Sequence, residues 1–197
     1  MRPGEEGTII GRNTAGAPAG EERCSTMERT ETRVPGFTIR PAREEDAGLI
    51  LSLIRGLAEY EKMADAVETD VETLRKNLFE RGQAQVIIGE AAGEAVGFAL
   101  YFYNFSTFQG KHGLYLEDLF IRPEHRGRGY GSAMLAWLAQ KAREEDCGRF
   151  EWICLDWNAP ALKVYRAIGA VPLEGWTIQR LTGDALSRLA EQAGPKE

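Results

Sequence analysis

The 197-residue sequence predicts one α/β (α+β) domain in which helices pack on the faces of a β-sheet. Patterns typical of strands and helices follow one another in the order β-α-α-β-β-β-α-β-α-β. Hydrophobic residues make up 43% of the chain, which is enough for a buried core. No internal repeat is visible, so this order describes one sheet with its flanking helices.

The first 35 residues differ from the rest of the chain. Residues 1–35 are rich in Gly, Pro, Ala, Thr and charged residues, and they show almost no hydrophobic periodicity. This composition is typical of a disordered tail, so the folded domain is expected over residues 36–197. Met27 lies close to the first predicted strand, and translation from Met27 rather than Met1 is a hypothesis that mass spectrometry of the native N-terminus tests.

The first elements are a strand over 37–42, which Pro41 ends, and a helix over 43–62. Acidic residues in its first turn suit the helix dipole. A second helix is expected over 70–80, with Gly82 placed to stop it. The first helix has a single apolar stripe, formed by Ala47, Ile50, Leu51, Ile54, Leu57 and Ala58.

The later elements begin with two strands, 84–92 and 95–105, which flank Gly93-Glu94 as in a hairpin. A third strand ends at Pro123. The expected helix that follows has Met134, Leu135, Leu138 and Ala142 at helical spacing, and Gly148 would close it. The remaining expected elements are a strand over 149–157, a helix over 159–169 and a last strand over 176–182.

Composition excludes several classes of function. The net charge of -6 argues against a general nucleic-acid binder and mildly favours a cationic ligand. Cys24, Cys147 and Cys154 share no ligand spacing and only two histidines are present, so neither a disulfide framework nor a metal site is expected. Without an apolar run of membrane-spanning length or a secretory signal, we expect a cytoplasmic protein with reduced thiols and no membrane partner.

A glycine-rich stretch, Arg126-Gly127-Arg128-Gly129-Tyr130-Gly131-Ser132, follows a predicted strand and opens a predicted helix. In this context backbone N–H groups and the helix dipole bind phosphate. A Walker A loop is excluded because no Gly-Lys-Ser/Thr ends the stretch. A dinucleotide fingerprint is excluded because Ser132 stands where G-x-G-x-x-G, counted from Gly127, requires glycine. An ordinary tight turn before a helix stays open as an alternative.

The remaining pattern is R-x-x-G-x-G, formed by Arg126, Gly129 and Gly131, and it resembles the signature of the GCN5-related N-acetyltransferases. "YLEDLFIRPEHRGRGYGS" and "WNAPALKVYRAIGA" resemble the spermidine/spermine and thialysine acetyltransferase branch, and the likeness covers about residues 37–182. The resemblance implies a GNAT fold with a mixed, mostly antiparallel, twisted sheet of about six to seven strands. In this fold, splayed strands hold acetyl-CoA, and no metal is implied.

The resemblance also implies catalytic roles. An amine with a pKa of about 10 must lose a proton before it attacks a thioester, and the leaving thiolate must gain one. Tyr165 matches the tyrosine acid, although its helical spacing also suits an ordinary core stripe. Glu117 matches a base that acts through water. Asp118, on the opposite face of a regularly alternating strand, is either a substrate contact or a buried structural acceptor.

Two sets of binding residues follow from the same resemblance. The cofactor would be held by Leu119, Phe120 and Ile121 through their backbones, by the loop Arg126, Gly127, Arg128, Gly129, Tyr130, Gly131 and Ser132, and by Asn158, Ala159, Pro160 and Ala161. Asn158 would equally serve as a helix N-cap. The amine would meet Tyr60, Glu61, Glu117, Asp118, Glu151, Trp152 and Glu174, whose acidic members suit a cation.

The expected substrate is a small primary amine such as a diamine, a polyamine or a lysine analogue like thialysine. Phe108 stands where the polyamine enzymes commonly have tryptophan, and this loop is one residue longer, so the amine is less well defined than the chemistry. The alternatives are a protein lysine or N-terminal acetyltransferase, and an acyl-CoA-binding sensor without catalysis. The resemblance further implies a homodimer.

Overall fold

The computed structural model describes residues 29–194 and divides the chain after Ile153 into two compact units. We call residues 29–153 the N-terminal unit and residues 154–194 the C-terminal unit, and each is described by itself. Most of the tail predicted over residues 1–35 lies outside the described residues. The part that is described includes Thr30–Glu31, which form a short strand, β1, so the end of that segment belongs to the sheet.

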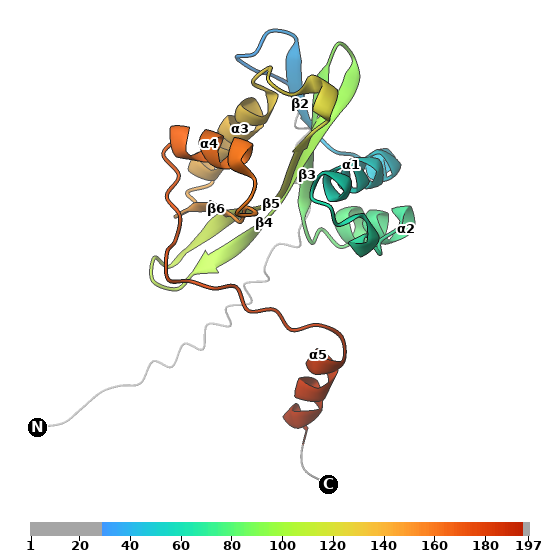
Figure 1. Ribbon diagram of the computed structural model, residues 1–197, viewed down its shortest axis with the longest axis vertical. Coiled ribbons are helices and arrows are strands. Elements are labelled where there is room, and N and C mark those ends of the chain that lie inside the picture. Colours follow the sequence, from blue (N-terminus) through green and yellow to red (C-terminus); the bar gives the residue numbers. More distant parts are fainter. Residues whose placement is uncertain (1–28, 195–197) are drawn as a thin grey trace, which may run out of the picture. The chain divides into compact units, whose positions relative to one another are not determined.

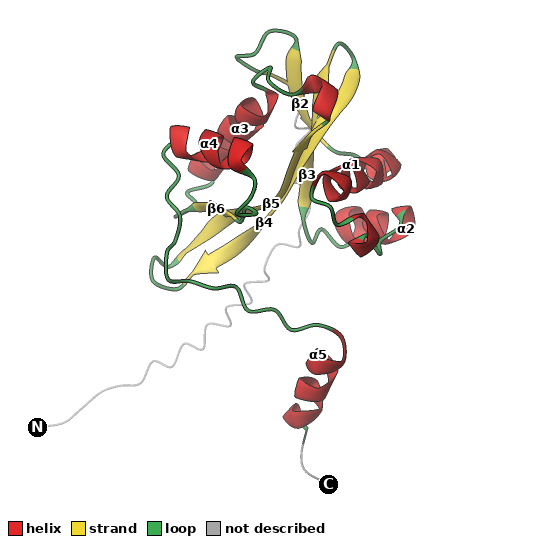
Figure 2. Ribbon diagram, viewed as in Figure 1, coloured by secondary structure: helices red, strands yellow, loops and turns green. Residues whose placement is uncertain are grey.

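The N-terminal unit is built on a six-stranded sheet whose strands are adjacent in chain order (Figures 1 and 2). The first five strands pair antiparallel, and the last pairs parallel to its neighbour. A mixed, mostly antiparallel sheet was expected, and it is confirmed. After β1 come β2 (Phe37–Pro41), β3 (Gln85–Ala91), β4 (Glu94–Ser106), β5 (Lys111–Ile121) and β6 (Phe150–Trp152).

Helices cover both faces of this sheet (Figure 1). On one face lie α1 (Ala47–Tyr60) and α2 (Val71–Arg75), and a π-helical turn, Lys76–Glu80, continues α2. On the other face lies α3 (Tyr130–Glu144), which connects β5 to β6. A connection of this kind is required because parallel neighbours cannot be joined by a tight turn.

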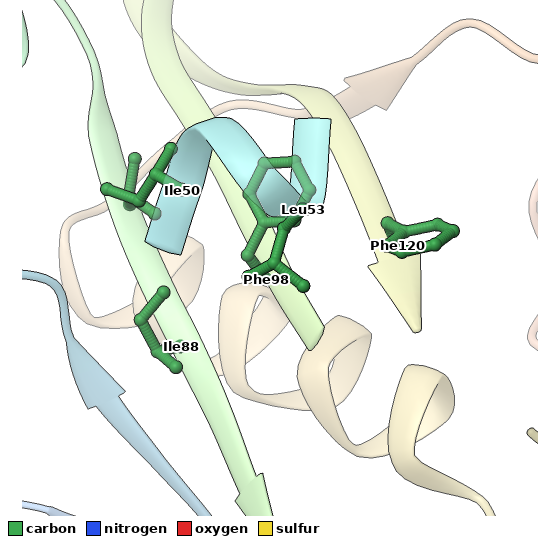
Figure 3. Close-up of a cluster of buried hydrophobic side chains, with 6 residues drawn as sticks. Ile50, Leu53, Ile88, Phe98 and Phe120 are labelled. Atoms are coloured by element: carbon green, nitrogen blue, oxygen red, sulfur yellow. The ribbon is translucent and has the colours of Figure 1, made fainter. Parts of the chain in front are cut away.

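The face under α1 holds a hydrophobic cluster that includes Ile50, Leu53, Ile88, Phe98 and Phe120 (Figure 3). The predicted stripe of α1 explains this packing, because four of its members, Ala47, Ile50, Leu51 and Ala58, are buried. Tyr60, the last residue of α1, packs against the edge of the same cluster. The core therefore fixes the end of α1 beside the end of β5.

The face under α3 is equally close-packed. Met134, Leu135, Leu138 and Ala142 are buried, as the helical spacing predicted. A Cβ on Gly89 would lie 2.6 Å from Cζ of Phe37 and 3.2 Å from Sδ of Met134, so only glycine permits this approach. The ring of Tyr130 stacks on Phe37 with centroids 4.3 Å apart, which anchors the first turn of α3.

Two expected boundaries and one expected strand were wrong. Gly148 does not close α3; Asp146 adopts a left-handed φ of 54°, and Cys147 N–H donates to Ala142 O in a Schellman motif. The strand expected over 149–157 is limited to β6. Residues 176–182 form no strand within the described chain, because a strand needs a pairing partner and local propensity supplies none.

The C-terminal unit contains α4 (Ala159–Ala167), α5 (Gly183–Ala190) and a 3₁₀ turn, Glu191–Ala193. None of these elements contains a buried residue. Large apolar side chains of the unit are exposed, among them Trp176 at 82% and Val171 at 80%. No helix among residues 29–194 combines the length and apolar character needed to cross a membrane.

Candidate active site

A β-bulge interrupts β5 at the acidic pair. Leu116 pairs with Tyr101 of β4, and Asp118 pairs with the next residue, Leu100, so Glu117 is the extra residue between them. Strict alternation across the Glu117-Asp118 pair was assumed from the sequence, and the bulge breaks it. Leu116 and Asp118 consequently face opposite sides of the sheet, although they are two residues apart.

The register places Asp118 on the same face as α1. Its partner Leu100 packs against the cluster under that helix, and so does Phe120, two residues along β5. The next pair in the other direction is Phe102 with Tyr115, whose rings lie 5.0 Å apart. Asp118 therefore lies between the apolar core and an aromatic pair, whereas Glu117 is exposed to solvent.

The surroundings of Asp118 favour its neutral form. Burial, followed by the negative charges of Glu117 and Glu61, raises the pKa of Asp118 to about 6. Burial also raises the pKa of Glu61. These carboxylates are close enough to influence one another, and a cation placed among them would relieve both the repulsion and the cost of burial.

Tyr60 and Glu61 reach this region because α1 ends in a Schellman motif. Lys62 adopts a left-handed φ of 61°, and Met63 N–H donates to Ala58 O at 2.8 Å. Glu61 is the C-cap residue and its N–H still donates to Leu57 O. The position of Glu61 is thus set by backbone hydrogen bonds rather than by a flexible loop.

One edge of β5 is open beyond the bulge. β6 pairs only with Leu114 to Leu116, whereas β4 pairs with β5 as far as Ile121. Arg122 N–H donates to Val96 O in β4, so by alternation the peptide groups of Phe120 also point to β4. Those of Leu119 and Ile121 face the open edge, where an extended ligand would add like a strand.

The glycine-rich loop lies between this edge and α3. Gly127 and Gly129 adopt left-handed φ values of 75° and 84°, which explains why glycine stands there. Gly129 is the N-cap of α3 and has no side chain to satisfy the first N–H groups of the helix. A pyrophosphate fits here, because these N–H groups and the helix dipole favour an anion. The Tyr130 side chain is buried, so only its backbone faces the loop.

The two arginines of the loop make contacts within the protein. Arg126 Nε–H donates to Ile121 O at 2.9 Å, and its guanidinium carbon lies 4.2 Å from the centroid of the Tyr60 ring. Arg128 donates to Glu124 O at 3.3 Å. Both side chains are exposed, so their charges remain close to the loop where an anion would bind.

The predicted pair Glu151 and Trp152 is divided between the two faces of the sheet. Glu151 pairs with Tyr115 on the α1 face, and Trp152 pairs with Leu116 on the α3 face. Glu151 Oε2 accepts a hydrogen bond from Asn104 Nδ2 at 3.1 Å and lies 2.8 Å from Arg149 Nε. Arg149 already balances the negative charge of Glu151, so this carboxylate attracts a charged amine less strongly than an unpaired carboxylate would.

The remaining predicted residues belong to the C-terminal unit. Asn158 caps α4, since its side chain accepts from Ala161 N–H at 3.4 Å, which confirms the N-cap role. Ala159 to Ala161 form the first turn of α4, and Tyr165 is a half-buried residue in the same helix. Glu174 is exposed in the segment between α4 and α5.

Sequence reasoning missed the bulge and the aromatic pair of Phe102 and Tyr115. The signal for the bulge is the pattern of β5, in which Leu114, Leu116 and Phe120 are buried but an acidic pair stands between them. Regular alternation would place Leu114, Leu116 and Phe120 on one face of the sheet, together with Asp118. Among residues 29–194, no group of three or more His, Cys, Asp or Glu side chains is arranged to hold a metal ion.

Comparison with known proteins agrees with this geometry. Residues 52–170 match the model of the Acetyltransferase (GNAT) family. The chain is 41% identical over 164 residues to a thialysine N-epsilon-acetyltransferase from Bos taurus, covering 77% of this chain and 96% of the relative. It is 32% identical over 171 residues to a human spermidine/spermine N(1)-acetyltransferase-like protein, covering 81% of this chain and 24% of that protein.

A similar fold occurs among solved structures. An integron cassette protein from V. cholerae superposes with a TM-score of 0.68 at 25% identity, over 79% of this chain and 98% of its own. The expected GNAT fold is therefore confirmed by the arrangement of strands and by the family match.

Proposed function

The chain belongs to the acetyltransferase (GNAT) family, and from this premise we propose that it transfers acetyl from acetyl-CoA to the primary amine of a small cationic substrate. The observation that carries the proposal is the acidic bulge at Glu117-Asp118. It lies where β5 and β6 stop pairing, and the glycine-rich loop follows the same strand. An anionic cofactor and a cationic amine would therefore meet at one end of β5.

The residues of the N-terminal unit suit the binding of both partners. Acetyl-CoA, when bound, supplies the thioester whose acetyl group is transferred. Leu119 and Ile121 would hold its extended arm through their peptide groups, and the N–H groups of residues 127–132 would hold its pyrophosphate. Asp118 and Glu61 would hold the charged amine, since a cation compensates buried carboxylates.

Two side chains are proposed to move protons. Glu117 is an exposed carboxylate at the bulge, so water reaches it, and it would accept the proton of the ammonium through a water molecule. Tyr165 would supply a proton from its hydroxyl group to the leaving group. Its half-buried position in α4 suits a hydroxyl that is only partly solvated.

A diamine, a polyamine or a lysine analogue is the substrate class that we propose. Relatives of this chain include enzymes named for thialysine and a protein named for its likeness to spermidine/spermine acetyltransferases. Each of these substrates has a second charged group, and the site offers more than one carboxylate. A protein substrate is the second candidate, and it would require an open groove beside Tyr60.

A parallel assay tests the proposal. The full chain is incubated with acetyl-CoA and either a panel of free amines (thialysine, ornithine, spermidine and putrescine) or lysine-containing peptides, while released thiol is measured. We expect release with at least one small diamine or amino-acid amine and little with peptides. Release with peptides alone would favour the protein acetyltransferase. Binding of acetyl-CoA in calorimetry, without release on any amine or peptide, would favour the sensor.

We also propose that the protein is a cytoplasmic homodimer. The dimer rests on the family resemblance; the C-terminal unit, described by itself, buries no residue of its helices and exposes Trp176, Leu186 and Leu189. A surface of this kind is costly in water unless another surface covers it. The cytoplasmic location rests on the composition, and fractionation of the source cells tests it.

A further inference from the structure

Arg126, the first residue of the glycine-rich loop, holds together three parts of the N-terminal unit. Its Nε–H donates to the carbonyl of Ile121, the last residue of β5. Its guanidinium carbon lies 4.2 Å from the centroid of the Tyr60 ring and 5.5 Å from that of Phe120. These distances are within the range of cation–π contacts.

The partners of Arg126 belong to different functional regions. Ile121 O faces the open edge of β5, on the side proposed for the cofactor arm. Tyr60 ends α1 immediately before Glu61, whose carboxylate is part of the acidic group around Asp118. Arg126 therefore connects the region proposed for the cofactor with the region proposed for the amine.

Both ends of this connection are rigid. The Schellman motif fixes Tyr60, and the ring packs against the core cluster. Phe120 is buried in that cluster, and a Cβ on Gly56 of α1 would lie 3.0 Å from its ring atoms. The loop itself contains the left-handed Gly127 and Gly129, so it depends on contacts such as those of Arg126 to hold one conformation.

We propose that Arg126 is a positioning residue: by stacking on Tyr60 and bonding to Ile121 O, it holds the glycine-rich loop in the conformation that binds the cofactor. This inference rests on the proposed function for the identity of the ligand. It assigns to Tyr60 a role in cofactor affinity, in addition to its predicted place beside the amine.

The size of the effect follows from the exposure of the contact. Cation–π pairs at exposed sites contribute about 0.5–1 kcal/mol, which corresponds to about a two- to fivefold change in an equilibrium constant. The contact with Arg126 is made by the face of the Tyr60 ring, so it depends on the aromatic ring and not on the hydroxyl group. Phenylalanine at position 60 should therefore preserve the coupling, and leucine should remove it.

The experiment measures the Kd of CoA by calorimetry for the full-length wild type, Tyr60→Phe, Tyr60→Leu, Arg126→Gln and the double variant Tyr60→Leu/Arg126→Gln. We expect Tyr60→Phe to match the wild type and Tyr60→Leu to weaken CoA binding by about two- to fivefold. The double variant should bind no more weakly than Arg126→Gln alone, because the pair acts as a unit.

Several outcomes would overturn the inference. If Arg126→Gln weakens CoA binding while Tyr60→Leu leaves the Kd unchanged, the arginine acts directly on the ligand and not through the stack. Additive losses in the double variant would show independent roles. Thermal unfolding of each variant excludes misfolding, and Tyr60→Phe keeps the test valid if Tyr60→Leu is unstable. Absence of CoA binding by the wild type would instead contradict the proposed function.

Discussion

Asp118 is a carboxyl group whose surroundings oppose ionisation, since it is largely removed from water and faces two further carboxylates. Its folded-state pKa of about 6 lies above the ordinary value of 3.8. Between these values the Asp118 carboxyl binds more protons in the folded chain than in the unfolded chain. The contribution of Asp118 to the free energy of unfolding therefore falls as the pH rises from about 4 to about 6, and its stabilisation is absent above that range.

Asp118→Asn should remove this pH dependence. A shift of this size corresponds to a difference on the order of 2–3 kcal/mol between the two ends of the range. Denaturant unfolding of the wild type and the variant at several pH values measures it. Asp146→Asn is the matched control, because Lys111 lowers the pKa of that exposed carboxyl and its contribution has the opposite sign. Parallel pH curves for the wild type and Asp118→Asn would contradict the prediction.

Tyr165 should matter for turnover and not for cofactor affinity. Loss of a positioned proton donor typically costs 10²- to 10⁴-fold, and we expect Tyr165→Phe to lower kcat by about 100-fold. The Kd of CoA should stay within error of the wild type. Tyr103→Phe removes a hydroxyl that donates to Glu145 at the far end of α3, and it should leave kcat unchanged. An unaltered kcat in Tyr165→Phe would remove this tyrosine from the mechanism.

At the scale of elements, the glycine-rich loop joins the end of a β-strand to a helix N-terminus, and its proposed function depends on its backbone conformation. Gly127 has a φ of 75°, and a Cβ there would meet no atom within 4 Å. Gly110, in the hairpin between β4 and β5, has a φ of 64° and equally open space. The two positions differ mainly in their distance from the proposed phosphate site.

Alanine at either glycine should destabilise the fold by a similar amount, about 1 kcal/mol, because both adopt the left-handed conformation. Only Gly127→Ala should weaken CoA binding, by about tenfold or more, since its peptide group belongs to the anion site. Thermal unfolding and calorimetry on both variants separate these effects. Equal Kd values for Gly127→Ala and Gly110→Ala would show that the loop does not hold the cofactor.

The elements that the sequence predicted well are those in which local pattern and tertiary packing agree. The stripe of α1, the spacing in α3 and the loop glycines all correspond to structure. The strand expected over 176–182 failed because pairing partners are not local. The bulge at Glu117 was hidden for a similar reason: which residue of β5 is extra depends on the register with β4, which the sequence of one strand does not contain.

At the scale of the whole molecule, the sheet with its helices and the C-terminal unit differ in how they are stabilised. The N-terminal unit contains all the buried apolar residues of the described chain. The C-terminal unit carries Tyr165 and Asn158 but buries none of its helical residues. The residues predicted for one site are thus divided between the two units.

Disrupting that apolar surface should change the oligomeric state. We expect the full chain to elute as a dimer in size-exclusion chromatography with light scattering, and Leu186→Asp to shift it towards monomer, because a buried charge without a partner is costly. Phe108→Asp, in the exposed hairpin between β4 and β5, is the control and should remain dimeric. A monomeric wild type at all concentrations, or a dimeric Leu186→Asp, would contradict the proposed assembly.

The extra residue in β5 has a consequence for the comparison of this chain with distant members of its family. Because one residue is added, the residues of β5 after Glu117 face the sides of the sheet opposite to those that regular alternation would give them. In a chain that lacks this residue, the counterpart of Asp118 follows the counterpart of Leu116 directly, so an alignment without a gap here would match that carboxylate to Glu117. Gap placement at this single position therefore decides whether an aligned carboxylate is the same carboxylate in space.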